Sequence, residues 1–425
     1  MKICLVGLGI SNREMINLLT DQGNTVYLSN NSALSISDKN FLDNKNISYE
    51  ESHGELLKSC DLAILSPGVP PDSDAAKIIF GNKIRYTTEI EYAWTHIKRF
   101  NREAVFIGVT GTNGKTTTTS LIGHVIREIG YPCFIGGNIG VPLVSAPVNL
   151  PYYVLEISSF QMFWTTKFFP EISVLINLAP DHLNWHRNLE EYYGCKKEMV
   201  LRTLKAGGVG IINENTDINY SGGHKVFFSK DFIDNGIFSF SDLKIKIKND
   251  FLNMNIYREN AVAAVLTLLN MGFGKDLIEN SLSSFKAPSH RIEFCGKKAG
   301  IKYYDDSKAT NVHAAINAYR SFRNTNYIAI LSGVPKNEDM SELISELENF
   351  SKKTIVFGDM EKEIKKYKIP DNFLFVNSLE ESLKVSKDFA SEGDCVILSP
   401  AGASFDKYKS YKERGDHFKS LVDKL

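Results

Sequence analysis

The chain has 425 residues, with 49 Lys and Arg against 50 Asp and Glu. Its length predicts two to four domains, and three fit best, because one hydrophobic core stops growing at roughly 250–300 residues. The net charge of -1 excludes the basic surface that nucleic acid or an anionic membrane requires, so any phosphate site must be local.

The apolar pattern and the cysteines favour an intracellular protein. No apolar run approaches the roughly 18 residues that a membrane span needs, and the N-terminus becomes polar too early for a secretory signal. The six cysteines are scattered without a C-x-x-C pair, which is typical of reduced thiols that serve as small buried residues. We therefore expect a cytoplasmic protein that does not insert into membranes.

Residues 1–94 are predicted to form a Rossmann-like domain. An apolar strand at the N-terminus precedes a helix, and Ser11 and Glu14 have the spacing of a capping box at its start. A further strand over 62–68 places Ser66 at the carboxyl end of a sheet. Ligands of open α/β folds usually bind on that side.

The first turn matches a dinucleotide-binding loop only in part. Gly7 and Gly9 fit the first two glycines of the G-x-G-x-x-G pattern, but Asn12 stands in the third position. The next strand ends in Ser29, where an acidic residue would bind an NAD ribose. A flavin or nicotinamide is therefore disfavoured, whereas a uridine diphosphate stays open.

A central domain is predicted for residues 95–287, after a linker at 92–103. Its clearest feature is AVFIGVTGTNGKTTTTSLIGHVIREIG at 104–130, which reads as an apolar strand, a glycine-containing loop and an amphipathic helix. The N–H groups of such a loop and the positive end of the helix dipole bind phosphate oxygens. The general pattern has a glycine where this chain has Val109, so the loop is a variant.

The side chains of this loop fit a nucleoside triphosphate. Lys115 would neutralise the β- and γ-phosphates, and the Thr116 hydroxyl would bind Mg²⁺. The residues expected to contact ATP here are Gly111, Thr112, Asn113, Gly114, Lys115, Thr116 and Thr117.

Polar residues at the following strands suggest a metal site. Glu156 interrupts an apolar strand, and a buried carboxylate is costly unless it is paired or binds a cation. The next strand leads into His182, and Lys196 follows on a helical stretch. A strand end in the phosphate-loop domain is a place where ligands bind, which favours a functional role for His182.

Residues 288–425 are predicted to form a second Rossmann-like domain. Strand-like runs at 326–333, 353–359, 372–377 and 394–402 alternate with helical stretches. This alternation predicts another parallel sheet, and the chain as a whole is assigned to the α/β class.

Six segments together resemble the Mur ligases, the amide-forming ligases of peptidoglycan synthesis. They are TGTNGKTTT, LEISSFQ, NLAPDHLNWH, SHRIE, DDSKATN and SPAGASFDKYKSYKERG, in the family's order and across essentially the whole chain. The resemblance implies a UDP-binding domain, a central ATPase domain and a C-terminal domain that brings the amino acid. It also implies that ATP activates UDP-N-acetylmuramoyl-L-alanine as an acyl phosphate, which D-glutamate then attacks.

The resemblance also implies two Mg²⁺ ions, a monomer, and roles for named residues. The catalytic residues would be Lys115, Glu156, His182 and Lys196. The metal ligands would be Thr116, Glu156, His182 and Lys196. Lys196 would be carbamylated, and Lys197 is the alternative. Asn260, Arg291 and Asp306 would bind ATP. The substrates would contact Ile10, Ser11, Ser29, Asn30, Ser66, Gly68, Asn138, Ser159, Lys308, Thr310, Lys336, Ser404 and Tyr411.

Two other functions remain open from the sequence. A related ligase could add another amino acid to a UDP-muramoyl peptide or to a folate, although DDSKATN and the N-terminal domain disfavour this. A non-catalytic nucleotide-binding regulator could retain the phosphate loop, although the presence of Lys115, Glu156, His182 and Lys196 argues against lost catalysis.

Overall fold

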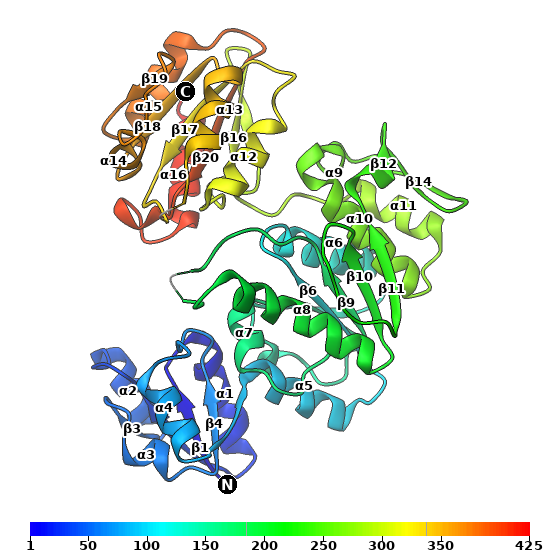
Figure 1. Ribbon diagram of the computed structural model, residues 1–425, viewed down its shortest axis with the longest axis vertical. Coiled ribbons are helices and arrows are strands. Elements are labelled where there is room, and N and C mark those ends of the chain that lie inside the picture. The colour runs from blue at the N-terminus through cyan, green and yellow to red at the C-terminus, as the bar shows by residue number, and fades with distance from the viewer. Residues whose placement is uncertain (184, 337) are drawn as a thin grey trace. The chain divides into compact units, whose positions relative to one another are not determined.

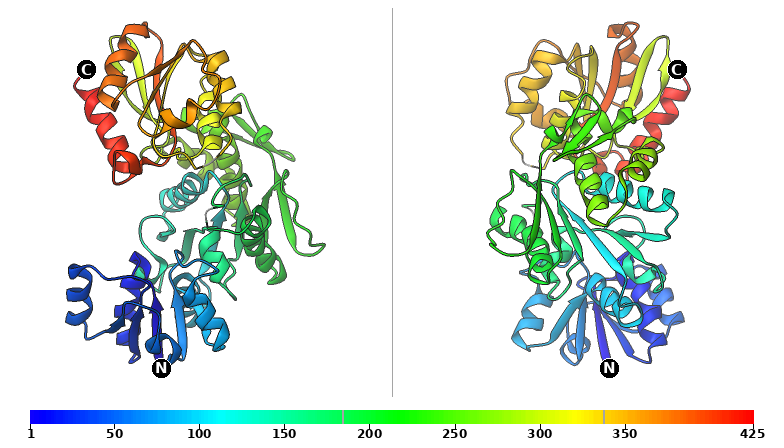
Figure 2. Two further views of the ribbon diagram at one scale, coloured as in Figure 1. Left: turned by 60° about the vertical axis from the view of Figure 1, so that its left-hand side comes forward. Right: turned by 90° about the vertical axis from the view of Figure 1, so that its right-hand side faces the viewer.

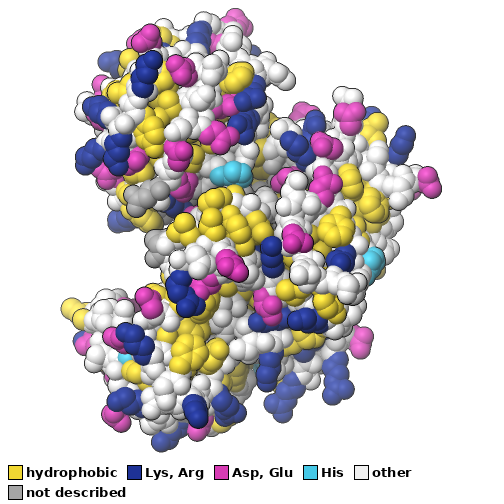
Figure 3. All heavy atoms as spheres, in the orientation of Figure 1, with side chains coloured by type: hydrophobic (Ala, Val, Ile, Leu, Met, Phe, Trp, Pro, Cys, Tyr) yellow, Lys and Arg dark blue, Asp and Glu magenta, His cyan; other side chains and the backbone are white. Residues whose placement is uncertain are grey.

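The computed structural model describes residues 1–183, 185–336 and 338–425. The chain divides into two compact units. Figures 1 and 2 show the ribbon coloured by residue number, and Figure 3 shows one face with the side chains coloured by type. One contains Met1–Asn249 and Glu259–Phe285, and the other contains Asp250–Arg258 and Lys286–Leu425. The division of the first unit into domains at residue 94 stays a prediction.

The first unit begins with a five-stranded parallel sheet in the order β3-β2-β1-β4-β5. Its strands are β1 (Lys2–Val6), β2 (Thr25–Ser29), β3 (Ser48–Glu50), β4 (Leu62–Leu65) and β5 (Arg85–Thr88). The helices are α1 (Ile10–Asp21), α2 (Ile36–Asn44), α3 (Glu55–Lys58), α4 (Asp74–Gly81) and α5 (Glu89–Phe100).

Both faces of this sheet are covered, because apolar side chains of its central strands point to both sides. Ile3 and Leu5 of β1 pack into a cluster with α1, whereas Cys4 and Val6 point to the other face and pack with α3 and α4. This two-sided burial is the pattern of a parallel sheet in a doubly wound fold. The Rossmann-like prediction is confirmed.

Two local predictions in this region are wrong. The helix α1 begins at Ile10 with Gly9 as its N-cap, so Ser11 lies inside the helix and forms no capping box with Glu14. The start is fixed instead by Asn12, whose amide donates to the carbonyls of Val6 and Gly7. The predicted linker at 92–103 is largely helix α5, which begins at an N-cap formed by Thr88.

The central part of the first unit contains a six-stranded parallel sheet in the order β11-β10-β9-β6-β8-β7. Its strands are β6 (Val105–Thr110), β7 (Cys133–Gly137), β8 (Tyr152–Glu156), β9 (Ile172–Leu175), β10 (Val209–Asn213) and β11 (His224–Phe228). The neighbouring helical elements are α6 (Lys115–Glu128), η1 (Leu143–Ser145), α7 (Ser159–Trp164) and α8 (Leu189–Lys205). Since β6 lies between β8 and β9, the segments that follow these three strands meet at one sheet edge.

A small antiparallel sheet follows, made of β12 (Ile233–Asp234), β13 (Ile237–Phe240) and β14 (Leu243–Lys246). The short helix η2 (Lys230–Phe232) precedes this sheet. The helices α9 (Asp250–Asn253), α10 (Asn255–Asn270) and α11 (Lys275–Ser283) follow it. No helix among residues 1–183, 185–336 and 338–425 is long and apolar enough to cross a membrane.

The second unit is built on a six-stranded sheet in the order β15-β16-β20-β17-β18-β19, parallel except for β15 at its edge. The strands are β15 (Glu293–Lys298), β16 (Ile301–Asp305), β17 (Tyr327–Ser332), β18 (Lys353–Phe357), β19 (Phe373–Phe375) and β20 (Cys395–Ala401). The helices are α12 (Val312–Arg320), α13 (Ser341–Phe350), α14 (Met360–Ile364), α15 (Leu379–Phe389), η3 (Ser404–Asp406) and α16 (Tyr411–Asp423). The predicted second parallel sheet is confirmed, and β15 was not anticipated.

The six cysteines are free thiols. Four are buried, as expected, whereas Cys195 and Cys295 are only partly buried.

Candidate active site

The phosphate loop joins β6 to α6 and depends on two glycines with positive φ. Gly111 has φ +153° and Gly114 has φ +83°, in the region that favours glycine. A Cβ atom on Gly114 would lie 2.1 Å from Nδ2 of Asn260. Lys115 folds back over the loop, and its Nζ donates to the carbonyl oxygens of Gly111 and Thr112 at 2.8 and 2.9 Å.

A residue that the sequence analysis missed, Asn177, holds this loop in shape. It follows β9, and its carbonyl and side-chain oxygens accept from the N–H groups of Thr112 and Asn113 at 3.0 and 2.9 Å. Its amide nitrogen donates to Glu259 at 3.3 Å. A polar amide directly after the apolar run ISVLI was the signal in the sequence.

Asn260 also contacts the loop. Its amide donates to the carbonyl of Gly114 at 2.9 Å and to the hydroxyl of Thr118 at 3.0 Å. The structure therefore brings this predicted ATP-binding residue to the start of α6.

Glu156 unites three segments that are distant in the sequence. It ends β8, is 3% exposed, and accepts from Thr116 Oγ1 and Asn138 Nδ2, each at 2.7 Å. Its backbone carbonyl accepts from the N–H of Asn138 at 2.9 Å. Glu156 thus joins the phosphate loop, through Thr116, to the loop after β7, through Asn138.

Lys196 reaches the same loop from α8. Its side chain is buried, and Nζ donates to the carbonyl of Gly111 at 2.8 Å and lies 4.7 Å above the ring of Tyr192. Burial, and then the positive charge of Lys115, lower the pKa of Lys196 well below its ordinary value. Lys197, the alternative in the sequence, is only partly buried.

His182 lies beside the same tyrosine. Its ring centroid is 5.8 Å from that of Tyr192 and 4.7 Å from that of Phe160. The backbone of His182 has φ +58°, which is uncommon for a non-glycine residue and directs the chain sharply away from β9. Asp181 precedes it, with Oδ1 3.6 Å from Nδ1 of His182.

Ser159, predicted to contact substrate, begins α7 three residues after Glu156. Its hydroxyl lies 2.9 Å from Nε2 of His186, a buried histidine that the sequence analysis did not single out. Burial lowers the pKa of His186.

The predicted uridine-binding residues lie at the carboxyl edge of the first sheet. Ser29 is buried, and its hydroxyl donates to Glu50 at 2.6 Å and lies 2.8 Å from Nδ1 of His53. The amide of Asn30 donates to the carbonyl of Ser32 at 2.9 Å. The other predicted residues, Ile10, Ser11, Ser66 and Gly68, lie at or near the starts of α1 and of the loop after β4.

In the second unit, Arg291 lies just before β15 and Asp306 lies just after β16, at the same end of these two paired strands. Asp306 follows β16 and is buried, and its carboxylate accepts from Ser399 Oγ at 2.7 Å and from the N–H of Ile292 at 3.3 Å. Burial raises the pKa of Asp306 to about 7. Lys308 lies 4.0 Å above the ring of Tyr411, so these two predicted substrate residues lie together.

Arg414 was missed by the sequence analysis because its partners are distant in the chain. It is buried on α16, and its guanidinium donates to the hydroxyl and carbonyl of Ser307, to the carbonyl of Gly402 and to the hydroxyl of Ser332. Burial lowers the pKa of Arg414 to about 10. Arg414 therefore ties the segment before Lys308 to the one before Ser404.

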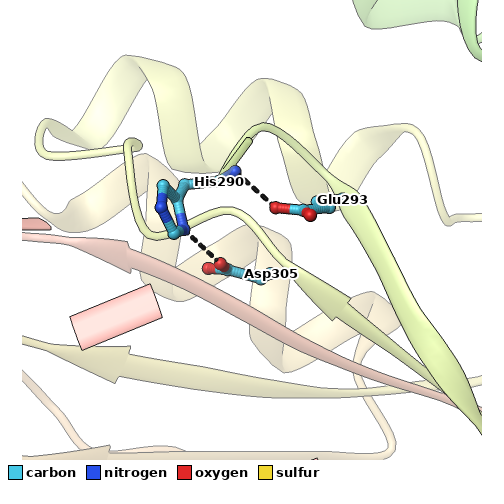
Figure 4. Close-up of side chains that lie close together, drawn as sticks. All are labelled: His290, Glu293 and Asp305. Atoms are coloured by element: carbon cyan, nitrogen blue, oxygen red, sulfur yellow. Dashed lines mark hydrogen bonds and ion pairs between the residues drawn. The ribbon is translucent and has the colours of Figure 1, made fainter. Parts of the chain in front are cut away.

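Figure 4 shows a second polar cluster, made of His290, Glu293 and Asp305. Nδ1 of His290 is 2.6 Å from Oδ2 of Asp305, and Glu293 accepts from the N–H of His290 at 2.8 Å. Lys419 lies 3.3 Å from the same Glu293 oxygen. The three side chains could hold a metal ion by geometry, but these contacts explain the cluster as a brace for the turn before β15.

Comparisons with known proteins agree with this architecture. Three family models match in order: the MurD N-terminal domain over residues 2–75, the Mur ligase middle domain over 109–285, and the Mur ligase glutamate ligase domain over 290–402. The phosphate loop, Glu156 and Lys196 lie within the second match.

Full-length relatives and solved structures are also similar. The chain is 51% identical to a UDP-N-acetylmuramoylalanine–D-glutamate ligase of Petrotoga mobilis, with all of both chains covered, and 34% identical to that of Thermosipho africanus, with 100% and 99% covered. The fold is similar to that of the ADP-bound MurF ligase of Thermotoga maritima, with a TM-score of 0.65, 16% identity, and 94% and 95% of the chains covered. UDP-N-acetylmuramate-alanine ligase of the same organism gives a TM-score of 0.60 at 19% identity, with 100% and 99% covered. The chain belongs to the Mur ligase family.

Proposed function

We propose that this protein is an ATP-dependent ligase that joins D-glutamate to UDP-N-acetylmuramoyl-L-alanine through an acyl phosphate. The observation that carries the proposal is the convergence of Lys115, Thr116, Glu156 and Lys196 on one phosphate loop. The relatives named above, which carry this activity in their names over their full length, support the choice of substrates.

The first step brings together several negative charges. The carboxylate of the alanyl group attacks the γ-phosphorus of ATP, an acyl phosphate forms and ADP leaves. Lys115 would stabilise the transferring phosphoryl group, because a fixed cation is most effective where charge develops. The N–H groups of Gly114 and Lys115, at the N-terminus of α6, would hold the remaining phosphate oxygens, whereas those of Thr112 and Asn113 donate to Asn177.

The residues fit the two Mg²⁺ ions that the family resemblance implies. Thr116 and Glu156 offer hard oxygen donors only 2.7 Å apart, and the ring of His182 contacts that of Tyr192, the ring that also lies 4.7 Å from Nζ of Lys196. Mg²⁺ would supply charge neutralisation between the phosphates and the attacking carboxylate. Glu156 now shares its oxygens with Thr116 and Asn138, so these hydrogen bonds would rearrange around an ion.

Lys196 fits a carbamate. An uncharged amine adds to CO₂ to give R–NH–COO⁻ and a proton, and the buried Lys196 amine has a lowered pKa that favours the uncharged form. The product would turn a cation-repelling side chain into an oxygen ligand. The negative charges of Asp181 and Glu156 act on Lys196, so a carbamate there would need a cation between the carboxylates.

The second step needs a site for an amino acid with two carboxylates. Lys308, Thr310, Lys336, Ser404 and Tyr411, all in the second unit, would supply the cations and hydroxyl groups for it. The D-glutamate amine attacks the acyl carbon, phosphate leaves and a proton is released. Arg291 and Asp306 would hold ATP from this unit. We expect a cytoplasmic monomer, since the UDP-linked substrate is made inside the cell.

The proposal is tested by phosphate release from purified protein with ATP, Mg²⁺ and UDP-N-acetylmuramoyl-L-alanine. Amino acids are added one at a time, and turnover is expected with D-glutamate and not with L-glutamate, L-lysine or meso-diaminopimelate. Turnover with a different amino acid would identify a related ligase. No turnover with any combination, despite ATP binding, would favour a non-catalytic regulator.

A further inference from the structure

A cavity of about 800 Å³ lies in the first unit, at the amino ends of β4 and β5. Leu62 and Arg85, which line it, are the first residues of these two strands. The predicted uridine-binding residue Ser66 follows β4 at its other end, after about 13 Å of strand. The phosphate loop, residues 111–117, does not line the cavity. The cavity is therefore separate from both predicted nucleotide sites.

The lining of this cavity is mainly cationic, although the protein as a whole is close to neutral. Glu91 is the one acidic residue among the described residues that line it. Nε of Arg85 donates to the backbone carbonyl of Asp61 at 3.3 Å, which orients the guanidinium without neutralising its charge. The cavity therefore has a positive potential that attracts anions. The cations of the lining are Lys83, Arg85, Arg99 and Lys167.

The carboxylate of Glu91 is engaged by neutral donors of the protein itself. Glu91 is buried, and its oxygens accept from the N–H groups of Thr166, Lys167 and Phe168 and from the hydroxyls of Thr87 and Thr166. The bond to the N–H of Lys167 also fixes the backbone from which this lysine extends. Because these donors satisfy Glu91, the cations of the lining can bind a ligand that brings its own negative charge.

Phe80 provides a flat apolar surface in the same cavity. Its ring stacks on Trp164 at a centroid distance of 6.0 Å and an interplanar angle of 27°, and it meets Tyr86 edge to face at 5.8 Å. These two contacts hold the ring in place, yet Phe80 is 53% exposed. A fixed aromatic ring with an uncovered surface is suited to stack with a planar group such as a nucleobase.

We propose that this cavity is a further ligand site, which binds a nucleoside phosphate with its phosphate against the cations and its base on Phe80. Inorganic phosphate would leave the ring unused, and a run of acidic residues in a peptide brings charge but no planar group. A nucleoside phosphate matches both features of the lining. The volume of about 800 Å³ is within the range of sites for small organic ligands.

The first experiment locates the binding site by photolabelling. The full chain is irradiated with azido-AMP, whose photoreactive group is on the base, and the labelled residues are identified by mass spectrometry. Label is expected on Phe80, Tyr86 or Tyr92, which all line the cavity, and excess AMP should prevent it. Label confined to the phosphate loop, or no label in the cavity at millimolar probe, would overturn the inference. Labelling needs no turnover, so it is independent of the ligase activity.

The second experiment removes the cations one at a time. In Arg85→Gln and in Lys167→Gln, the azido-AMP concentration that half-labels the cavity should rise at least about fivefold, because each change removes a charged donor to phosphate. Lys77→Gln is the matched control, since Lys77 is exposed on α4 and lies outside the lining. An equal rise in all three variants, or no rise in either cavity variant, would overturn the inference.

The third experiment tests the class of ligand by competition with the label in the cavity. AMP should protect at concentrations at least about fivefold lower than ribose 5-phosphate, which has the same phosphate but no base. In Phe80→Leu, which keeps an apolar side chain but removes the ring, the two competitors should protect alike. An equally large preference for AMP in Phe80→Leu would overturn the role of the ring. Better protection by a hexaglutamate peptide than by AMP would overturn the choice of a nucleoside phosphate.

Discussion

Glu89 offers a direct test of how this fold handles a buried carboxyl group. It is the first residue of α5 and is 3% exposed, and its carboxylate accepts from the N–H of Val144 at 2.7 Å. Burial outweighs this bond and one from the N–H of Leu143, and raises the pKa of Glu89 from 4.5 to about 7. Replacing it by glutamine keeps the shape and an acceptor oxygen but removes the ionisation.

The expected effect follows from the difference between the folded and unfolded states. At about 1.4 kcal/mol per pKa unit, the step from 4.5 to about 7 corresponds to about 3 kcal/mol. Because the folded-state pKa is raised, the stabilising contribution of the protonated group is complete below pH 4.5. It falls as the pH rises and is lost above about pH 7. Glu89→Gln should therefore match the unmodified protein at pH 4.5 and be more stable at pH 8 by up to about 3 kcal/mol.

The measurement is the melting temperature of both proteins by calorimetry between pH 4.5 and 8.5. Their difference should grow with pH by several degrees, at roughly 2 °C per kcal/mol, because the pH dependence of other groups, such as Asp306, cancels. Glu103→Gln, at an exposed site just after α5, should show no pH-dependent difference. A Glu89→Gln difference that is flat, or that falls with pH, would refute the assignment of burial as the dominant cause.

Four substitutions test the phosphate loop and the second unit. Lys115→Ala should lower turnover at least 10²-fold at unchanged melting temperature, and near-normal turnover would contradict its role. Lys196→Ala should regain part of its activity with added formate or acetate; no rescue, with an intact mass that never shows a labile CO₂ adduct, would exclude the carbamate. Gly114→Ala should weaken ATP binding at least tenfold by calorimetry, because its Cβ would lie 2.1 Å from Asn260 and φ is +83°. Arg414→Met should destabilise the second unit by about 2–4 kcal/mol in urea unfolding, since it leaves buried carbonyls without donors; a smaller loss would show that water replaces it.

The parts of the fold that were predicted correctly are those set by local pattern. The phosphate loop followed from a strand, two glycines and an apolar helical face, all within 27 residues at 104–130. The predicted helix is α6, Lys115–Glu128, and Gly130 with φ +103° lies just past its end. The parallel sheets followed from apolar runs that alternate with helical stretches.

The errors and omissions share one cause, which is that long-range contacts decided the outcome. Ser11 has the spacing of a cap, but the amide of Asn12 donates to the carbonyls of Val6 and Gly7 and lies 3.4 Å from that of Ile64. The N-cap is therefore Gly9, two residues earlier. Asn177 and Arg414 are ordinary polar residues in the sequence. Asn177 holds Asn113, 64 residues away in the chain, and Arg414 donates to Ser307, 107 residues away. Neither role could be predicted from the neighbouring sequence.

Lys115 of the phosphate loop and Lys196 of α8 approach the same backbone oxygen, so the charge of one affects the pKa of the other. Nζ of Lys115 and Nζ of Lys196 each lie 2.8 Å from the carbonyl oxygen of Gly111. Two ammonium groups on one oxygen repel each other in a buried site, which disfavours a positive charge on both. Burial selects Lys196, whose pKa is lowered by desolvation first and by Lys115 second.

The same geometry favours the reaction with CO₂. A carbamate nitrogen keeps one N–H, so Lys196 could retain its hydrogen bond to Gly111 while its new carboxylate gains an attraction to Lys115 in place of the repulsion. The positive charge of Lys115, which disfavours the ammonium form of Lys196, would thus stabilise the carbamate. Removing that charge with Lys115→Met should raise the pKa of Lys196 and reduce the carbamate fraction at a fixed CO₂ pressure, whereas an unchanged fraction by ¹³C NMR would show that the two lysines are not coupled.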